Sequence, residues 1–147
     1  MATLSPEEKF GIRYGSRGIR TVDQIWSLLI GIVVILLGIL GFIQTGFTNY
    51  TEMTDHYIFG LFQTNGFHNT AYIVVGLLWL LGAFALTPAG NQGLNIALTV
   101  VLLILAVLGF LGYWHLLSIP AGVNGDNVLH LVAAIATLIF ITFAAAV

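Results

Sequence analysis

Four histidines are the residues of this sequence best suited to ligand chemistry. Three of them, His68, His115 and His130, stand near the ends of long apolar segments, and His56 lies in a longer polar connection. Neutral imidazole binds haem iron, divalent metals or the magnesium of chlorophyll, and helical bundles build such sites from ligands on different helices at one depth. The three histidines are therefore candidate ligands of haem or chlorophyll.

The alternative interpretation is that each histidine caps a helix or bonds a loop carbonyl at a membrane interface. The sequence has no His-x-x-x-His or Glu-x-x-His pair, a spacing that puts two metal ligands on one helical face. It also has no cysteine, which excludes disulfides and thiolate sites. The spacing thus favours the alternative, and we expect no resident metal ion.

A polar cluster is predicted around the last of these histidines. Asn69 and Tyr72 stand at the start of one apolar segment, and Asp126 and Asn127 at the start of another, close to His130. Buried polar groups in a membrane need partners, because lipid offers none. We expect these side chains to meet and to fasten the two helix ends together.

The segments that carry these residues are four apolar runs without Lys, Arg, Asp or Glu. A membrane-spanning helix needs about 20 such residues. The whole chain is 59% hydrophobic and 7% charged, too few charges to cover a water-facing surface. The sequence predicts an all-α integral membrane bundle of four helices over residues 21–147, with spans at about 25–43, 70–86, 94–114 and 128–147.

Positive charge orients the chain across the membrane. Short loops rich in Lys and Arg stay in the cytoplasm, and every cationic residue lies in the first twenty: Lys9, Arg13, Arg17 and Arg20. Residues 1–20 are predicted to be a cytoplasmic amphipathic segment that lies on anionic headgroups or docks on a partner domain. Both termini are expected in the cytoplasm, in a prokaryotic inner membrane or a thylakoid.

The connections carry local signals. Thr21 and Gln24 have capping-box spacing, and Asp126 or Asn127 is placed to cap the last helix. Residues 87–93, with one proline and two glycines, predict a tight inner turn. In the long outer loop, apolar residues 57, 58, 61 and 62 recur at helical spacing and predict a short interfacial helix.

An internal duplication is also indicated. Residues 38–42 match residues 106–110, and the spacing of Asn69, Tyr72 and Gly76 is repeated by Asn127, His130 and Ala134. Each match is followed or preceded by an outer loop, so both hairpins run in the same direction. This favours a parallel repeat of two hairpins related by an axis along the membrane normal.

Both asparagine-led helices resemble a family of small, uncharacterised four-helix membrane proteins of actinobacteria, cyanobacteria and haloarchaea. The family pattern is Asn, then His three residues later, then a small residue. Residues 126–130 look like the second copy, and residues 69–76 look like the first, with Tyr72 in place of histidine. The resemblance implies the fold and no activity, and Tyr72 weakens the idea of a symmetric histidine pair.

Three functions follow as hypotheses. The first is a non-catalytic subunit that packs into or stabilises a larger membrane complex, with a membrane protein or a second copy as partner. The second is a haem- or chlorophyll-binding bundle, for example an accessory photosynthetic subunit. The third is a small-solute transporter or channel, which would use Asn95 and Thr99. Ion coupling is not expected, because no acid or base stands inside the predicted spans. No nucleophile with a base is visible, so we expect neither an enzyme nor a nucleic-acid partner.

Overall fold

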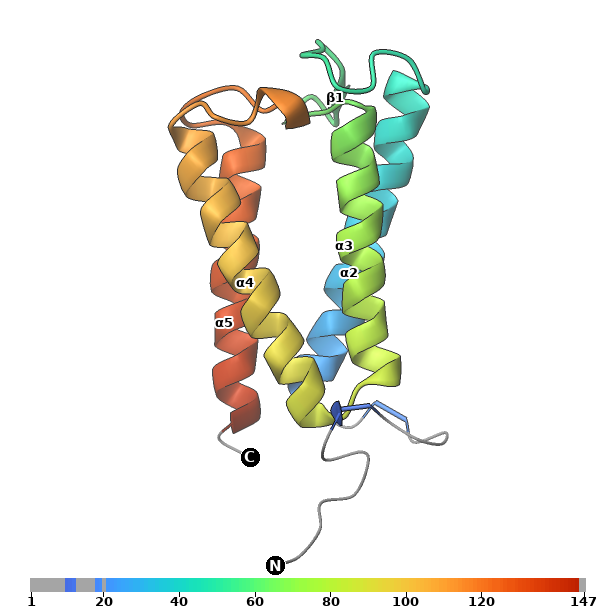
Figure 1. Cartoon of the computed structure of the whole chain (residues 1–147), viewed down its shortest axis with the longest axis vertical. Helices are drawn as coiled ribbons and strands as arrows, with labels where there is room; N and C mark the ends of the chain where they lie inside the picture. Colours follow the sequence, from blue (N-terminus) through green and yellow to red (C-terminus); the bar gives the residue numbers. More distant parts are fainter. Residues whose placement is uncertain (1–9, 13–17, 20, 146–147) are drawn as a thin grey trace, which may run out of the picture.

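A computed structural model of the chain describes residues 10–12, 18–19 and 21–145. Four long helices dominate this part: α2 (Val22–Thr45), α3 (Gly66–Ala85), α4 (Pro88–Phe110) and α5 (Gly125–Ala145). Each is long and apolar enough to cross a membrane. Helix α2 packs mainly on α3, and α4 on α5, which gives two hairpins side by side (Figure 1). The predicted all-α four-helix membrane bundle is confirmed.

The two ends of the bundle differ in their connections. At one end α3 passes into α4 through Leu86 and Thr87 alone, and we call it the inner end after the predicted orientation. At the outer end lie residues 46–65 and residues 111–124, the second of which contains the 3₁₀ helix η1 (His115–Leu117). The orientation across a membrane stays a prediction. The amphipathic character predicted for residues 1–20 falls largely outside the described residues.

All four helices begin before the apolar segments that predicted them. The largest difference is at α4, where residues 88–93, predicted as a turn, are the first turns of the helix. Pro88 occupies the first helical position, where its missing N–H costs nothing. Thr87 Oγ1 accepts a hydrogen bond from Gly90 N at 3.2 Å and caps the helix. The inner turn is therefore shorter than expected.

The caps also differ from those predicted. Asn65 Oδ1 accepts from His68 N at 2.9 Å and caps α3, so Asn69 lies inside the helix. Asn124 Oδ1 accepts from Asn127 N at 3.0 Å, and neither Asp126 nor Asn127 is the cap of α5. The Thr21 side chain makes no capping bond at α2. Each helix thus takes polar residues into its first turn.

The predicted interfacial helix of the outer loop is a small β-hairpin instead. Strand β1 (Tyr57–Ile58) pairs antiparallel with β2 (Phe62–Gln63). Between them Phe59 and Gly60 have φ of +54° and +69°, which a right-handed helix cannot use and a hairpin turn can. The helical spacing of apolar residues was therefore a misleading signal in so short a segment.

Small residues hold each hairpin together. A Cβ on Gly31 would lie 2.9 Å from Gly76 O, so the α2 and α3 backbones are in direct contact there. Lipid gives helices no hydrophobic push toward one another, and such close packing must hold them. The side chains of Asn69 and Asn127 fill the space beside Gly41 and Gly109, respectively. These matched contacts are what a duplicated hairpin would give.

Candidate ligand-binding site

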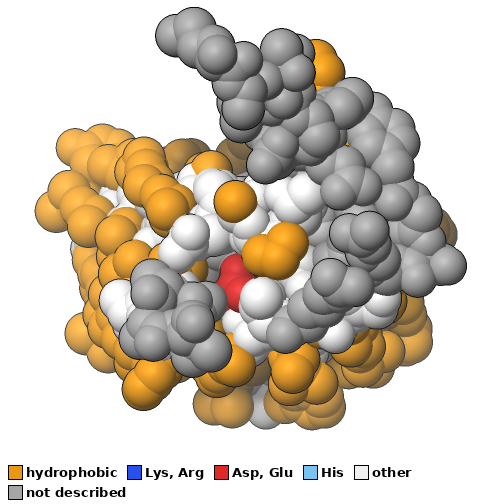
Figure 2. Space-filling model, turned by 90° about the horizontal axis from the view of Figure 1, so that it is seen from below, with side chains coloured by type: hydrophobic (Ala, Val, Ile, Leu, Met, Phe, Trp, Pro, Cys, Tyr) orange, Lys and Arg blue, Asp and Glu red, His pale blue; other side chains and the backbone are white. Residues whose placement is uncertain are grey.

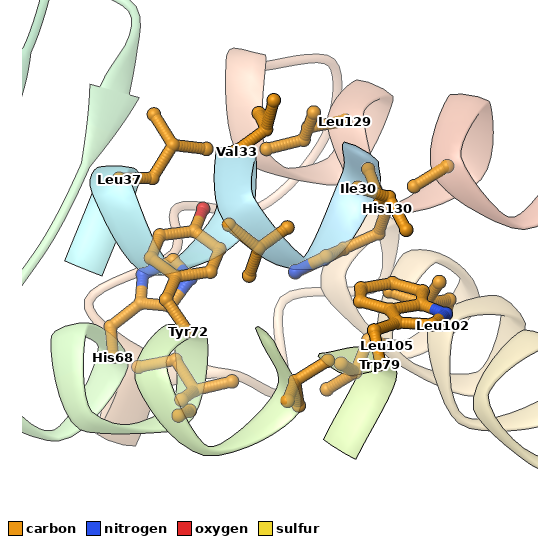
Figure 3. Close-up of a pocket in the computed structure, with 15 residues that line it drawn as sticks. Ile30, Val33, Leu37, His68, Tyr72, Trp79, Leu102, Leu105, Leu129 and His130 are labelled. Atoms are coloured by element: carbon orange, nitrogen blue, oxygen red, sulfur yellow. The ribbon is translucent and has the colours of Figure 1, made fainter. Parts of the chain in front are cut away.

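A cavity of about 70 Å³ lies between the two hairpins. Its wall is almost wholly apolar and includes Leu37, Leu102 and Leu129 from three of the helices (Figure 3). Four side chains add polar atoms or aromatic rings to this wall: His68, Tyr72, Trp79 and His130. The cavity is therefore an apolar space with a few convergent polar groups, the usual composition of a small-molecule site.

The His68 ring in this wall is oriented so that one nitrogen can accept a hydrogen bond. Its Nδ1 lies 3.3 Å from Gln63 O, and because a carbonyl only accepts, Nδ1 carries the hydrogen. In the neutral ring Nε2 then carries a lone pair. This Nε2 is buried and makes no hydrogen bond of normal geometry with the described residues, although the Leu117 backbone also lies close to the ring. Ligand-binding histidines commonly have this arrangement, in which the second nitrogen is fixed by a carbonyl.

His130 faces His68 from the other hairpin. The two ring centroids are 6.1 Å apart, and a nitrogen of His130 points toward the middle of the cavity (Figure 3). His130 Nδ1 is also buried without a partner among the described residues. An unpaired buried polar atom costs about 1–3 kcal/mol. A ligand or water that bonded both imidazoles would recover that cost.

Tyr72 connects the cavity wall to Asp126 at the start of α5. The Tyr72 ring stacks on His68 with centroids 4.3 Å apart, and its hydroxyl donates to Asp126 Oδ1 at 3.3 Å. The other carboxylate oxygen, Oδ2, accepts from Gln63 N at 2.9 Å. Gln63 thus bonds both His68 and Asp126, so one short strand positions groups from both hairpins.

The remaining predicted site residues lie elsewhere. His115 is exposed on η1 and does not line the cavity. Asn69 Nδ2 donates to Thr45 Oγ1 at 3.0 Å, and Asn127 Nδ2 donates to Gly122 O at 2.9 Å. Each asparagine therefore braces its own hairpin. Of the predicted polar cluster, Tyr72 and Asp126 bond directly, with His130 near His68.

The geometry limits what the cavity can hold. The described residues contain no group of three His, Cys, Asp or Glu side chains that could hold a metal ion. A volume of about 70 Å³ is far below the ~300–1,000 Å³ of pockets that hold drug-sized ligands. Both imidazoles are buried, so a tetrapyrrole does not reach them in this conformation. A small molecule fits best.

A second polar group, of which only Asn95 was a candidate from the sequence, lies between the cavity and the inner end. Asp23 Oδ2 accepts from Asn91 Nδ2 at 2.7 Å, and Asn91 Oδ1 accepts from Ser27 Oγ at 2.8 Å. Asn95 Oδ1 accepts from Trp79 Nε1 at 3.0 Å, and its Nδ2 donates to Ser27 Oγ at 3.1 Å. We call these five residues the axial network.

The expectation that no acid or base lies inside the membrane spans is wrong. Asp23, His68, Asp126 and His130 all lie within the candidate spans, so the membrane segments do contain acids and bases. Asp23, His68 and Asp126 fell outside the predicted spans because the helices start earlier than their apolar runs, whereas His130 already lay inside the last one. One signal was present: Asp23 and Ser27 have the same four-residue spacing as Asn91 and Asn95, which places each pair on one helical face.

Comparison with known proteins gives one match. A family model described as "Domain of unknown function (DUF4383)" matches residues 24–143, which include both hairpins and the cavity. No curated protein matches the chain. No solved structure matches it either.

Proposed function

The chain belongs to this family, a domain of unknown function, and from that starting point we propose that it is a non-enzymatic membrane protein that binds a small molecule between its two hairpins. One observation carries the proposal. His68 Nε2 and His130 Nδ1 are buried, lack partners among the described residues, and belong to rings that share the wall of an apolar cavity. Ionisable groups inside a membrane are expensive to keep and are commonly functional.

The chemistry of the cavity restricts the ligand class. His68 Nε2 in the neutral ring is an acceptor, so the ligand should offer a hydroxyl or another N–H or O–H donor. The rest of the ligand should be apolar and small, because the other wall atoms are apolar and the volume is about 70 Å³. Alcohols are the simplest molecules with both properties.

The proposal is tested with an alcohol series, from methanol to phenol, on the purified protein with ¹⁵N-labelled histidine. The ¹⁵N shift of an imidazole nitrogen reports whether it bears a proton or accepts a hydrogen bond. We expect His68 Nε2 and His130 to shift in a saturable way with the alcohols that fit. His56 and His115, which are exposed, serve as internal controls in the same spectrum.

Two substitutions make the test specific. His68→Ala removes the acceptor, and His115→Ala is the matched control on the exposed η1. We expect the first to abolish the saturable shift of His130 and the second to leave it intact. Equal shifts at all four histidines, or none at His68 and His130, would refute the proposal.

The role of a packing subunit in a larger membrane complex stays a prediction. The spans expose many apolar side chains, for example Leu29, Val100 and Val132, and contact with lipid accounts for them without a protein partner. A transporter or channel is less supported. Both polar side-chain atoms of Asn95 are hydrogen-bonded within the axial network, which lies between the cavity and the inner end.

A further inference from the structure

A second hollow, of about 150 Å³, opens at the inner end of the bundle. It is lined by Thr21 and Asp23 from the start of α2 and by Pro88, Ala89 and Gln92 from the start of α4. Figure 2 looks onto this end and shows an acidic side chain near its middle, among hydrophobic and other side chains. The hollow is separate from the histidine cavity, because the axial network lies between them.

Two side-chain oxygens of residues that line this hollow have no partner among the described residues. They are Asp23 Oδ1 and Thr21 Oγ1, both buried. The Asp23 side chain is 1% exposed, so water does not surround it freely. Its second oxygen is used by Asn91, as described above. One carboxylate oxygen therefore remains without a donor in a confined space.

The start of α4 does not supply that donor. A helix normally offers free N–H groups at its first turn, which would attract a carboxylate. Here Pro88 has no N–H, and the N–H of Gly90 is already bonded to Thr87 Oγ1. Two of the first-turn positions of α4 thus offer no free N–H, and the unpaired carboxylate oxygen of Asp23 would be stabilised by a positive charge.

We propose that this hollow binds a small monovalent cation, held by the Asp23 carboxylate and the Thr21 hydroxyl, with the Gln92 amide as a further oxygen donor at its rim. Carboxylate, hydroxyl and amide oxygens are the ligands that hard cations prefer. One carboxylate balances one positive charge, and the described chain places no second acid in the hollow. Sodium, potassium and ammonium share this chemistry.

The site connects to the rest of the protein through Asp23. The same carboxylate accepts from Asn91, and the axial network continues from Asn91 to Trp79 in the wall of the histidine cavity. A bound cation would hold the Asp23 carboxylate in place. The cation should therefore stabilise the fold itself, whether or not the histidine cavity binds a ligand.

The test is thermal unfolding of the purified full chain at constant ionic strength. Sodium, potassium or ammonium chloride replaces N-methylglucamine chloride stepwise, and a gluconate series shows whether the anion matters. We expect a saturable rise in the unfolding temperature with at least one of the three cations. Asp23→Asn should raise the half-saturating concentration by about tenfold or more, the effect of ~1.4 kcal/mol.

Further variants keep the result decisive. Glu52→Gln removes an exposed acid at the outer end and should leave the cation response unchanged. The Thr21 variants provide a second test in case Asp23→Asn does not fold. Thr21→Val should weaken the response to the cation, and Thr21→Ser, which keeps the hydroxyl, should retain it. The proposal is overturned if N-methylglucamine stabilises as well as the small cations, or if the response survives in Thr21→Val and Asp23→Asn. His68→Ala should leave the response unchanged, so this test and the alcohol test fail independently.

Discussion

Ser27 and Asn95 hydrogen-bond to each other across the bundle axis, with Asn95 Nδ2 donating to Ser27 Oγ at 3.1 Å. In the predicted repeat, a register that pairs Gly41 with Gly109 would make these two residues each other's counterparts, and likewise Asp23 and Asn91. The hairpins therefore meet through equivalent positions. Helices α3 and α5 have a different register, which pairs Asn69 with Asn127. In that register Tyr72 matches His130 and His68 matches Asp126, so the Tyr72–Asp126 bond corresponds to the His130–His68 contact.

The Ser27–Asn95 contact predicts energetic coupling between the hairpins. Ser27→Ala and Asn95→Ala should each destabilise the fold, because each leaves a buried partner unpaired. The double variant should cost less than the sum, with a coupling energy of about 0.5–3 kcal/mol. A double-mutant cycle measured by unfolding in mixed micelles checks this. Additive effects would mean that the two side chains do not interact.

Tightly packed glycines predict a large cost for a single methyl group. An alanine at Gly41 or Gly109 would overlap the side chain of Asn69 or Asn127, and such overpacking costs about 1–3 kcal/mol. Gly93→Ala is the matched control, because nothing lies within 4 Å of its added Cβ. That control should be neutral or stabilising, since alanine favours a helix. The unfolding temperatures of the three variants measure these effects. Equal unfolding temperatures would contradict the prediction that Gly41 and Gly109 are too tightly packed for a methyl group.

Tyr72→Phe tests the hydrogen bond between the Tyr72 hydroxyl and Asp126. The change removes only the hydroxyl that donates to Asp126, so we expect a loss of about 1–3 kcal/mol in the free energy of unfolding. Tyr113→Phe, at a side chain that is 70% exposed, should have little effect. Hydrogen exchange at the outer end should rise in Tyr72→Phe alone. A silent Tyr72→Phe would show that the Asp126 carboxylate does not depend on it.

The predicted orientation is open to direct measurement, because the chain has no cysteine and single cysteines can be labelled cleanly. Val123→Cys lies at the outer end, where Val123 is 87% exposed, and Ala89→Cys lies at the inner end, where Ala89 is exposed in the first turn of α4. In intact cells a membrane-impermeant maleimide should label the first and spare the second. Labelling of Ala89→Cys alone would reverse the assignment of inside and outside.

The sequence by itself determined the class of protein and its four spans. The length of an uninterrupted apolar segment can be read directly from the sequence. In a bilayer a segment of about 20 such residues forms a helix, because its backbone groups must bond to one another. Helix starts were less accurate, because α4 begins at Pro88 and α3 at Gly66, within polar residues that a hydropathy pattern assigns to loops. The β-hairpin at 57–63 was not predicted, because the positive φ of Phe59 cannot be read from the composition of the loop.

Only the tertiary structure decided which polar residues act together. His68, His115 and His130 looked equivalent in the sequence, yet the fold buries His68 and His130 beside one cavity and leaves His115 exposed. Asp23 precedes the first predicted span and had no partner in the sequence, yet the short Leu86–Thr87 connection brings Asn91 onto it. Such pairings depend on how two hairpins cross. Spacing along one helix contains no information about the rotation of its neighbour.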